Sequence, residues 1–157
     1  MAAPFRSSVM TVEPAWIDYN GHLNMAYYHV LFDRGVDEML LNVGLGLDYL
    51  KAHNASYFTA ECHVSYKREL PVHAPVYTTL RVVDFDAKRL HYMQELHHAG
   101  EEWLSAVGEC LVLHVDMGAR KVTPWPEDIR RRIEAAKAAH DALPPHPLMS
   151  RRIAIPH

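Results

Sequence analysis

The sequence predicts an α+β fold in which a curved antiparallel sheet wraps around one hydrophobic helix. From residue 25 to residue 43, apolar side chains recur at helical spacing and are so numerous that other structure must enclose the helix. Four later segments, between residues 57 and 116, alternate instead with a period of two residues. A strand, an enclosed helix, four long strands and a last helix, in that order, are accommodated by one sheet folded around the first helix.

One domain is indicated by the length of 157 residues, which can bury a core but is short for two domains. With 49% hydrophobic and 22% charged residues, the composition is that of an ordinary globular protein. The formal charge of -3 offers no basic surface for nucleic acid or for an anionic membrane. We therefore expect one domain over residues 1–143, with residues 144–157 as a Pro-rich tail packed on its surface.

The cytoplasm is the expected compartment. The first ten residues lack the apolar core of a signal peptide, and no stretch approaches the roughly 20 apolar residues of a membrane span. Cys62 and Cys110 could pair by number, but their apolar, strand-like surroundings favour buried free thiols in a reducing compartment. No Cys/His spacing is typical of zinc, and His97 and His98 point to opposite faces of a strand, so no metal is expected.

The first strand is predicted over residues 9–16, where Pro14 closes it. Asn24 suits the N-cap of the enclosed helix, which begins at Met25. Its apolar face is formed by Tyr28, Phe32, Gly35, Val36, Met39 and Val43. Gly44 and Gly46 end this helix.

The four long strands are predicted over residues 57–70, 75–86, 88–99 and 101–116. On the first of them, strict alternation places on one face Phe58, Ala60, Cys62, Val64 and Tyr66. The connections between the strands are short enough for hairpins, which predicts an antiparallel meander. Residues 127–143 predict a second helix with a solvent-facing side.

Four hydrogen-bonding side chains, Asp18, Asn20, His22 and Asn24, occupy alternate positions directly before the hydrophobic helix and are called the polar patch below. A carboxylate such as Asp18 can act as a general base on water or attack an ester directly, and His22 could share the proton transfer. Asn20 or Asn24 could orient water, and the helix start near Met25 offers N–H groups to a developing oxyanion. The alternative is structural, because Asp and Asn are common in loops and Asn24 could merely cap the helix.

The stretch "DYNGHLN" between the first strand and the helix resembles the hotdog-fold thioesterases. In the 4-hydroxybenzoyl-CoA thioesterase group, the matching residues are Asp18, Gly21, His22, Asn24 and Tyr28. Plant acyl-carrier-protein thioesterases have a similar D-x-N-x-H-x-N spacing and a "YRRE" strand that residues 66–69, "YKRE", echo. Within the hotdog group, "WIDYNGHLNMAYY", "HVSYKREL", "FDAKRLH", "LVLHVD" and "RRIAIP" are similar to the betainyl-CoA thioesterase type of bacterial carnitine degradation.

This resemblance implies a thioesterase that hydrolyses a small acyl-CoA to the free acid and CoA, with betainyl-CoA and glycine betaine as the narrower implication. The implied catalytic residues are Asp18, Asn20 and His22, and the implied substrate-binding residues are Trp16, Asn24, Met25, Tyr28, Glu61 and Glu69. The implied assembly is a homodimer or homotetramer. No cofactor is implied, since CoA is part of the substrate.

Two features bear on how the substrate is held. Two basic pairs near strand ends, Lys67 with Arg68 and Lys88 with Arg89, suit the phosphates of CoA, although each could be ordinary solvated charge. Aromatic faces hold a trimethylammonium group well. The aromatic residues near the polar patch and at the next strand are Trp16, Tyr19, Tyr27, Tyr28 and Phe58.

Two other functions stay open at the level of sequence. A hotdog dehydratase also pairs a His with a carboxylate, but its acid sits inside the helix, where this chain offers only Asp33, Asp37 and Glu38. A non-catalytic acyl-CoA-binding module would be favoured by loss of the acid, yet Asp18 is present. The thioesterase is therefore the leading hypothesis.

Overall fold

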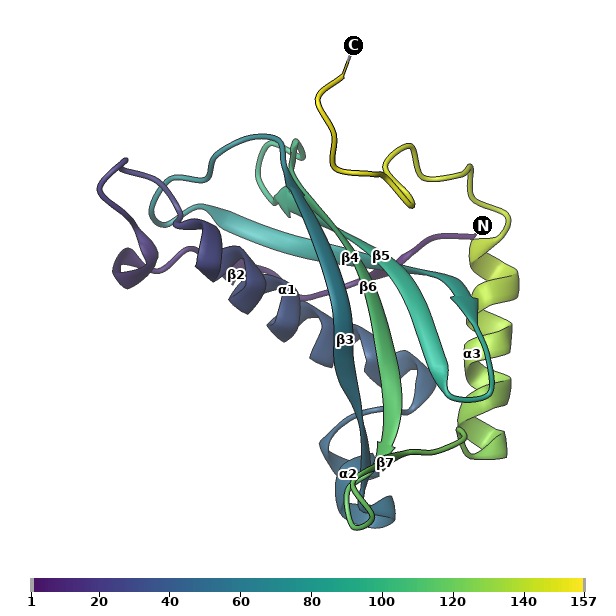
Figure 1. Cartoon of the computed structure of the whole chain (residues 1–157). Coiled ribbons are helices and arrows are strands. Elements are labelled where there is room, and N and C mark those ends of the chain that lie inside the picture. The colour runs from purple at the N-terminus through teal and green to yellow at the C-terminus, as the bar shows by residue number, and fades with distance from the viewer. Residues whose placement is uncertain (1, 157) are drawn as a thin grey trace.

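The computed structural model describes residues 2–156, and its main feature is one antiparallel sheet with a long helix across it (Figure 1). The long strands are β3 (Ala55–Tyr66), β4 (Pro75–Phe85), β5 (Arg89–His98) and β6 (Leu104–Asp116). The short strands are β1 (Phe5–Arg6) and β2 (Met10–Thr11), which pair with β4, and β7 (Lys121–Val122), which pairs with β6. The helices are α1 (Met25–Met39), α2 (Leu47–His53) and α3 (Glu127–His140), with 3-10 turns η1 (Pro14–Trp16) and η2 (Leu40–Val43).

The predicted enclosure of α1 is confirmed. Its buried side chains pack against the sheet in two hydrophobic clusters, one around Phe32 and Leu96 and the other around Met39 and Leu80. Gly35 allows this close approach, because a Cβ at that position would lie 1.9 Å from Oγ1 of Thr78 on β4. The apolar face of α1 predicted from the sequence is therefore the face that packs against the curved sheet.

The strand order differs from the predicted continuous meander. The sheet order is β1-β4-β5-β6-β3, so β4, β5 and β6 do form a meander, but β3 lies at the far edge beside β6. The prediction of a hairpin between β3 and β4 is wrong, because the 67–74 connection crosses the end of the sheet. Leu70 fixes it there, being fully buried and accepting a hydrogen bond from the Leu23 N–H at 2.8 Å.

Strict alternation along β3 is also wrong. A bulge shifts the register between Thr59 and Glu61, so that Thr59 faces Val112 of β6 and Cys62 faces Cys110. Val112 and Cys110 lie on the same face of β6, so Thr59 and Cys62 share the side that faces α1. Phe58 therefore does not lie on the same face as Cys62, although strict alternation predicts that it does. The expectation of two buried thiols also fails, because Cys62 on this edge strand is exposed while Cys110 is buried.

The first predicted strand is shorter in the structure, and the α-helical part of the predicted helix ends earlier than its pattern indicates. Only Met10–Thr11 of the predicted 9–16 strand is extended in the sheet, because residues 14–16 turn into η1 with Pro14 at its start. The α-helix ends at Met39, and η2 continues to Gly44, whose left-handed backbone (φ 85°) stops the helical run. The pattern predicts no element over 47–53, where the structure has α2.

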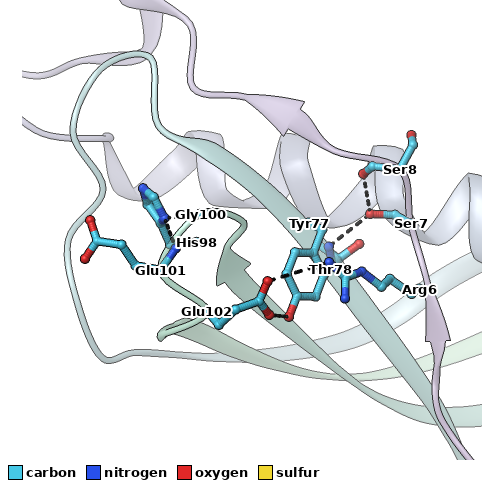
Figure 2. A network of polar contacts seen from close by, with 9 residues as sticks. All are labelled: Arg6, Ser7, Ser8, Tyr77, Thr78, His98, Gly100, Glu101 and Glu102. Atoms are coloured by element: carbon cyan, nitrogen blue, oxygen red, sulfur yellow. Dashed lines mark hydrogen bonds and ion pairs between the residues drawn. The ribbon is translucent and has the colours of Figure 1, made fainter.

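A polar network anchors the N-terminal segment to the sheet (Figure 2). The Thr78 N–H donates to Oγ of Ser7 at 3.0 Å, and the Arg6 guanidinium lies 3.6 Å from the centre of the Tyr77 ring. The Tyr77 hydroxyl donates to Glu102 in the β5–β6 turn at 2.6 Å. This network holds β1 on the edge of β4, opposite the β3 edge.

The sheet face away from α1 is covered by the C-terminal segment, which Figure 1 shows as a yellow strand-free stretch. Arg81 donates to the Pro144 carbonyl at 2.7 Å, and His146 bonds Glu95 at 2.8 Å. Further on, the Ser150 N–H donates to Glu109 at 2.8 Å. Within residues 2–156, no helix is long and apolar enough to cross a membrane.

Candidate active site

The polar patch forms a tight loop between η1 and α1. Ile17 and Leu23 make an isolated antiparallel bridge, and the Asp18 N–H donates to the His22 carbonyl at 3.1 Å. Gly21 closes the turn with a left-handed backbone (φ 83°), a conformation that favours glycine. The alternating polar side chains thus lie on a hairpin-like loop closed by the Ile17–Leu23 bridge, and not along a continuous strand.

Asp18 has one oxygen engaged and one free. Its Oδ1 accepts the Asn20 N–H at 2.8 Å, an Asx-type turn that fixes the carboxylate. Its Oδ2 makes no hydrogen bond to any of residues 2–156. The Asn20 side chain is exposed. The structure therefore positions a half-buried carboxylate with one oxygen available for chemistry.

His22 is paired with Glu69. Their Nε2 and Oε2 atoms are 3.3 Å apart, and Nδ1 of His22 lies 3.3 Å from the Leu23 carbonyl oxygen. Glu69 belongs to the 67–74 connection, which the buried Leu70 holds beneath the loop. Glu69, which the resemblance implies as a substrate-binding residue, contacts the His22 imidazole, because the connection crosses the sheet end at this point.

The start of α1 lies beside this pair. Asn24 accepts the Ala26 N–H at 2.9 Å and so caps the helix, as predicted. The Met25 N–H has no hydrogen-bond partner among residues 2–156 and lies at the positive end of the helix dipole. This arrangement offers one free backbone donor within the polar patch.

Two tyrosines flank the helix start. Tyr28 is buried at 4% exposure, and its ring meets that of Tyr66 edge to face at 4.9 Å. Burial raises the pKa of the Tyr28 hydroxyl, and the carboxylates of Glu69 and Asp18 add smaller contributions. Both acids therefore lie within electrostatic reach of the same hydroxyl. Tyr66 is half-exposed at 42%, and the sequence predicts it as part of the "YKRE" motif and of one face of the strand, without a site role.

The remaining aromatic residues do not converge on one point. Trp16 is buried and stacks on Tyr27 at 5.7 Å, with the Arg34 guanidinium 5.1 Å from its ring centre. Tyr19 is 99% exposed. Phe58 borders a pocket near the opposite end of β3. A single protomer thus does not assemble these rings into a cage.

The predicted CoA-binding residues are divided between the two ends of the sheet. Lys67 and Arg68 follow β3 at the end that holds the polar patch, where Arg68 lies 4.1 Å from the centre of the Trp103 ring. Lys88 and Arg89 lie at the β4–β5 turn, and Arg89 is bound by Asp86. Seven residues along β6 separate Ala106, opposite Tyr66, from Leu113, opposite Arg89, or roughly 23 Å at strand spacing. Within one protomer the two pairs cannot hold the same phosphate.

Glu61 is also remote from the polar patch. It lines a pocket of about 660 Å³ under the C-terminal segment, together with Arg89, Glu109 and Arg151. This pocket lies on the sheet face away from α1, because Glu61 is paired with Leu111, one residue out of step with Cys110. A direct contact between Glu61 and a substrate at Asp18 of the same protomer is not supported by this geometry.

Two hollows lie where α1 meets the β3 edge, and sequence reasoning missed both as sites. The first, called the α1–β3 cavity, has a volume of about 380 Å³ and is lined by His29, Asp33, Thr59, Cys62, Tyr92 and Gln94, among others. The second, called the acidic pocket, has a volume of about 840 Å³ and is lined by Asp33, Asp37, Glu38, Leu41 and Tyr57, among others. These acids had been considered only for a dehydratase.

Polar groups inside these hollows have distinct environments. Desolvation raises the pKa of the Asp33 carboxyl, and the neighbouring Asp37 carboxylate raises it further. The Tyr57 hydroxyl donates to Asp37 at 2.7 Å. Gln94 is 3% exposed, and its Oε1 has no hydrogen-bond partner. Within residues 2–156, no three His, Cys, Asp or Glu side chains are grouped to hold a metal.

The curved antiparallel sheet around one hydrophobic helix is the hotdog fold. The family model of the thioesterase-like superfamily matches residues 12–133, and the chain belongs to this family.

Individual relatives agree with this assignment. A betainyl-CoA thioesterase of Pseudomonas aeruginosa is 34% identical over 145 residues, covering 92% of this chain and 91% of that protein. An L-carnitine dehydrogenase/betainyl-CoA thioesterase of Rhizobium meliloti is 32% identical, and the match covers 90% of this chain but 28% of that longer protein. A Staphylococcus aureus protein whose structure was determined in complex with CoA superimposes with a TM-score of 0.89 at 26% identity, covering 99% and 98% of the two chains.

Proposed function

We propose that this protein hydrolyses a small acyl-CoA whose acyl group carries a quaternary ammonium, with betainyl-CoA as the model substrate. The observation that carries the reaction class is the polar patch, because the loop that holds a carboxylate with a free oxygen leads directly into a helix start with a free N–H. The similarity to two proteins named for betainyl-CoA motivates the acyl group. The products are the free acid and CoA.

Each residue of the patch has a role in this proposal. Asp18 carries the chemical step, acting on water or on the thioester carbonyl through its free Oδ2. The carbonyl oxygen, as it becomes negative, is stabilised by the Met25 N–H and the helix dipole. His22, held by Glu69, delivers a proton to the departing sulfur. Asn24 maintains the helix start, and Asn20 fixes the Asp18 carboxylate through its backbone.

The phosphates of CoA lie over Lys67 and Arg68 in this proposal. These two residues belong to the same 67–74 connection as Glu69. They therefore lie at the end of the sheet that holds the proposed catalytic residues. The Arg68 side chain is already supported by the Trp103 ring. Arginine and lysine together provide the planar and point-charge contacts that phosphate groups accept.

The site is completed by a second copy of the chain. β3 is an edge strand and carries exposed Phe58 and Tyr66, so it presents an unpaired hydrogen-bonding edge. Two identical edges related by a two-fold axis pair in antiparallel orientation. The Ala55 end of the partner's β3 then lies beside the Tyr66 end of this one. This pairing brings the partner's acidic pocket toward the polar patch.

In this proposal, the shared site recognises a cationic acyl group. Within one protomer, Asp33 is nine residues beyond Asn24, or roughly 14 Å along the helix axis, too far for an acyl group with one methylene between carbonyl and nitrogen. The partner's Asp33 and the partner's Asp37 supply the negative charge, and the partner's Tyr57 with Tyr66 supplies aromatic faces. Each ring contributes about 0.5 to 2 kcal/mol toward a trimethylammonium group.

The decisive experiment compares two thioesters of equal shape. Betainyl-CoA and 3,3-dimethylbutanoyl-CoA differ only in a charged nitrogen or a neutral carbon at the branch point. We expect kcat/KM to be on the order of tenfold or more higher for betainyl-CoA, as two aromatic contacts and a carboxylate imply. Equal kcat/KM values would overturn the cationic acyl group and leave a general short-chain thioesterase. Absence of hydrolysis across a panel of short acyl-CoA thioesters would overturn the reaction itself.

A further inference from the structure

Cys62 and Cys110 are placed for a reaction with each other that hydrolysis does not use. They are directly opposite on the antiparallel strands β3 and β6, although 48 positions separate them in sequence. Directly opposed residues have Cα atoms about 4.5 or 5.5 Å apart, and both values lie within the range that disulfides span. The two sulfur atoms are already 3.2 Å apart, with the Cys110 thiol donating to Cys62.

The two thiols have different environments, which suits a stepwise oxidation. Cys62 is exposed and Cys110 is buried, so a small oxidant meets Cys62 first. The hydrogen bond from Cys110 lowers the pKa of the Cys62 thiol, whereas the same contact and burial raise the pKa of Cys110. The thiolate is the reactive form of cysteine. Cys62 is therefore the thiol that reacts first with the oxidant, and Cys110 is the thiol that then reacts with the oxidised Cys62.

The surroundings of the pair are partly polar. Both cysteines line the α1–β3 cavity, together with the polar side chains of His29, Asp33 and Gln94. The Gln94 amide donates to Sγ of Cys110 at 3.5 Å, and Tyr92 lies beside it on β5. Pairing of β3 with a second copy would use backbone N–H and C=O groups. The side chains of Cys62 and Cys110 would therefore still face this cavity.

We propose that Cys62 and Cys110 form a site of reversible two-electron oxidation, with a peroxide as the oxidant and a cross-strand disulfide as the product. The Cys62 thiol first loses its proton, and the thiolate attacks one peroxide oxygen. The O–O bond breaks to give a sulfenic acid and hydroxide, which takes up the released proton and becomes water. Cys110 then attacks the Cys62 sulfur, the S–O bond breaks, and a second water leaves with the Cys110 proton. Two thiols and one hydrogen peroxide thus give one disulfide and two waters. A dithiol reverses the reaction.

The disulfide would tie the edge strand to its neighbour. The sulfur atoms must approach from 3.2 Å to about 2.05 Å, a shift that side-chain rotation can supply. The bond closes a long loop between β3 and β6, which restricts the unfolded chain. The oxidised protein is therefore expected to unfold at a higher temperature than the reduced protein.

The test uses the full-length protein, whose two cysteines make the mass analysis unambiguous. Reduced protein is exposed to one equivalent of hydrogen peroxide, denatured in N-ethylmaleimide and weighed by mass spectrometry. We expect a species with no maleimide adduct that gains two adducts after dithiothreitol, runs as a monomer on a non-reducing gel and has a raised Tm. The disulfide should form on the order of tenfold faster than in guanidinium, where the long loop must first close.

Matched single variants identify the order of the two steps. Cys110→Ser should stop at a sulfenic acid on Cys62 that dimedone traps, and Cys62→Ser should react far more slowly. A wild-type protein that stays reduced, proceeds to sulfinic acid or links two chains through Cys62 would overturn the proposal. A lowered Tm on oxidation would do the same, since the native fold would then not accommodate the bond. The mass readout on the wild type does not depend on the folding of either variant, and none of these outcomes depends on the acyl group that is hydrolysed.

Discussion

At the scale of single residues, the proposed function depends on how a few polar side chains are held. Asp18 is fixed by the Asn20 N–H on one oxygen, and this contact leaves the other oxygen unengaged. His22 is fixed by Glu69, a residue 47 positions away in the chain. Asn24 caps α1. The same loop chemistry that stabilises the turn therefore also orients the groups proposed to act on the thioester.

Replacement of Asp18 by Asn tests the chemical role directly. The Asn side-chain oxygen can still accept the Asn20 N–H, so the turn is preserved while the basic and nucleophilic carboxylate is lost. We expect kcat to fall by roughly 10²-fold or more with a small change in KM. Steady-state kinetics on the best substrate of the panel give both values.

The control is Asp48→Asn, which makes the same chemical change on an exposed residue at the start of α2. This variant should retain wild-type kcat. Near-normal turnover by Asp18→Asn, with the fold intact by circular dichroism, would show that Asp18 is only a turn residue.

At the scale of secondary-structure elements, the fit of α1 into the sheet determines where the polar patch lies. Gly35 faces Thr78, and the Thr78 side chain fills the space that a Cβ at position 35 would need. Rotation of the Thr78 hydroxyl alone would not open this space, because Cβ and Cγ2 of Thr78 also lie 3.0 and 3.3 Å from the position of the added Cβ. This contact fixes how closely α1 approaches β4. It thereby also fixes the position of the first turn of α1, where the polar patch ends.

The variant Gly35→Ala is expected to destabilise the protein although alanine is the better helix former. The new Cβ would lie 1.9 Å from Oγ1 of Thr78, which forces α1 or β4 to move. Such overpacking costs about 1 to 3 kcal/mol, against a gain of about 1 kcal/mol from helix propensity. Urea unfolding should show a lower midpoint.

A double-mutant cycle with Thr78→Ala isolates this contact. In the Thr78→Ala background, Gly35→Ala should cost less or become stabilising, because the clashing atoms are gone. An equal cost in both backgrounds would mean that the strain arises elsewhere along α1.

At the scale of the whole molecule, one sheet edge is covered and the other is open. β1 and β2 pair with β4, and the network around Tyr77 and Glu102 holds that edge (Figure 2). β3 has β6 on one side and no strand on the other within residues 2–156. The open edge runs beside α1, the α1–β3 cavity and the acidic pocket, so the proposed second subunit would pair along β3 and bring its own acidic pocket toward the polar patch.

Light scattering at micromolar concentration is expected to give about twice the 18.0 kDa chain mass, or a multiple of that dimer. The physical reason is the unpaired edge of β3 together with its exposed aromatic side chains. Dilution below the dissociation constant should lower activity per chain, because the acidic pocket comes from the partner in the proposed site. A fully active monomer would exclude a shared site.

The sequence by itself determined the fold class, the buried face of α1 and the cap at Asn24. It did so because helical and strand periodicities are local properties that a hydrophobic core must satisfy. The polar patch could be located for the same reason, since its residues are adjacent in the chain. The resemblance of its motif to known thioesterases supplied the expected chemistry.

Only the tertiary structure decided which distant residues join that patch. Hairpin-length connections do not reveal strand order, and the 67–74 segment crosses the sheet end where a turn was predicted. That crossing carries Glu69 to His22, while the bulge in β3 sets Cys62 against Cys110. Glu61 and Arg89, chosen from sequence, fall on the other face. Local propensity determines which side chains lie on the same face of a helix or strand. The packing of Leu70 against Leu23, which are far apart in sequence, determines which of these side chains come into contact.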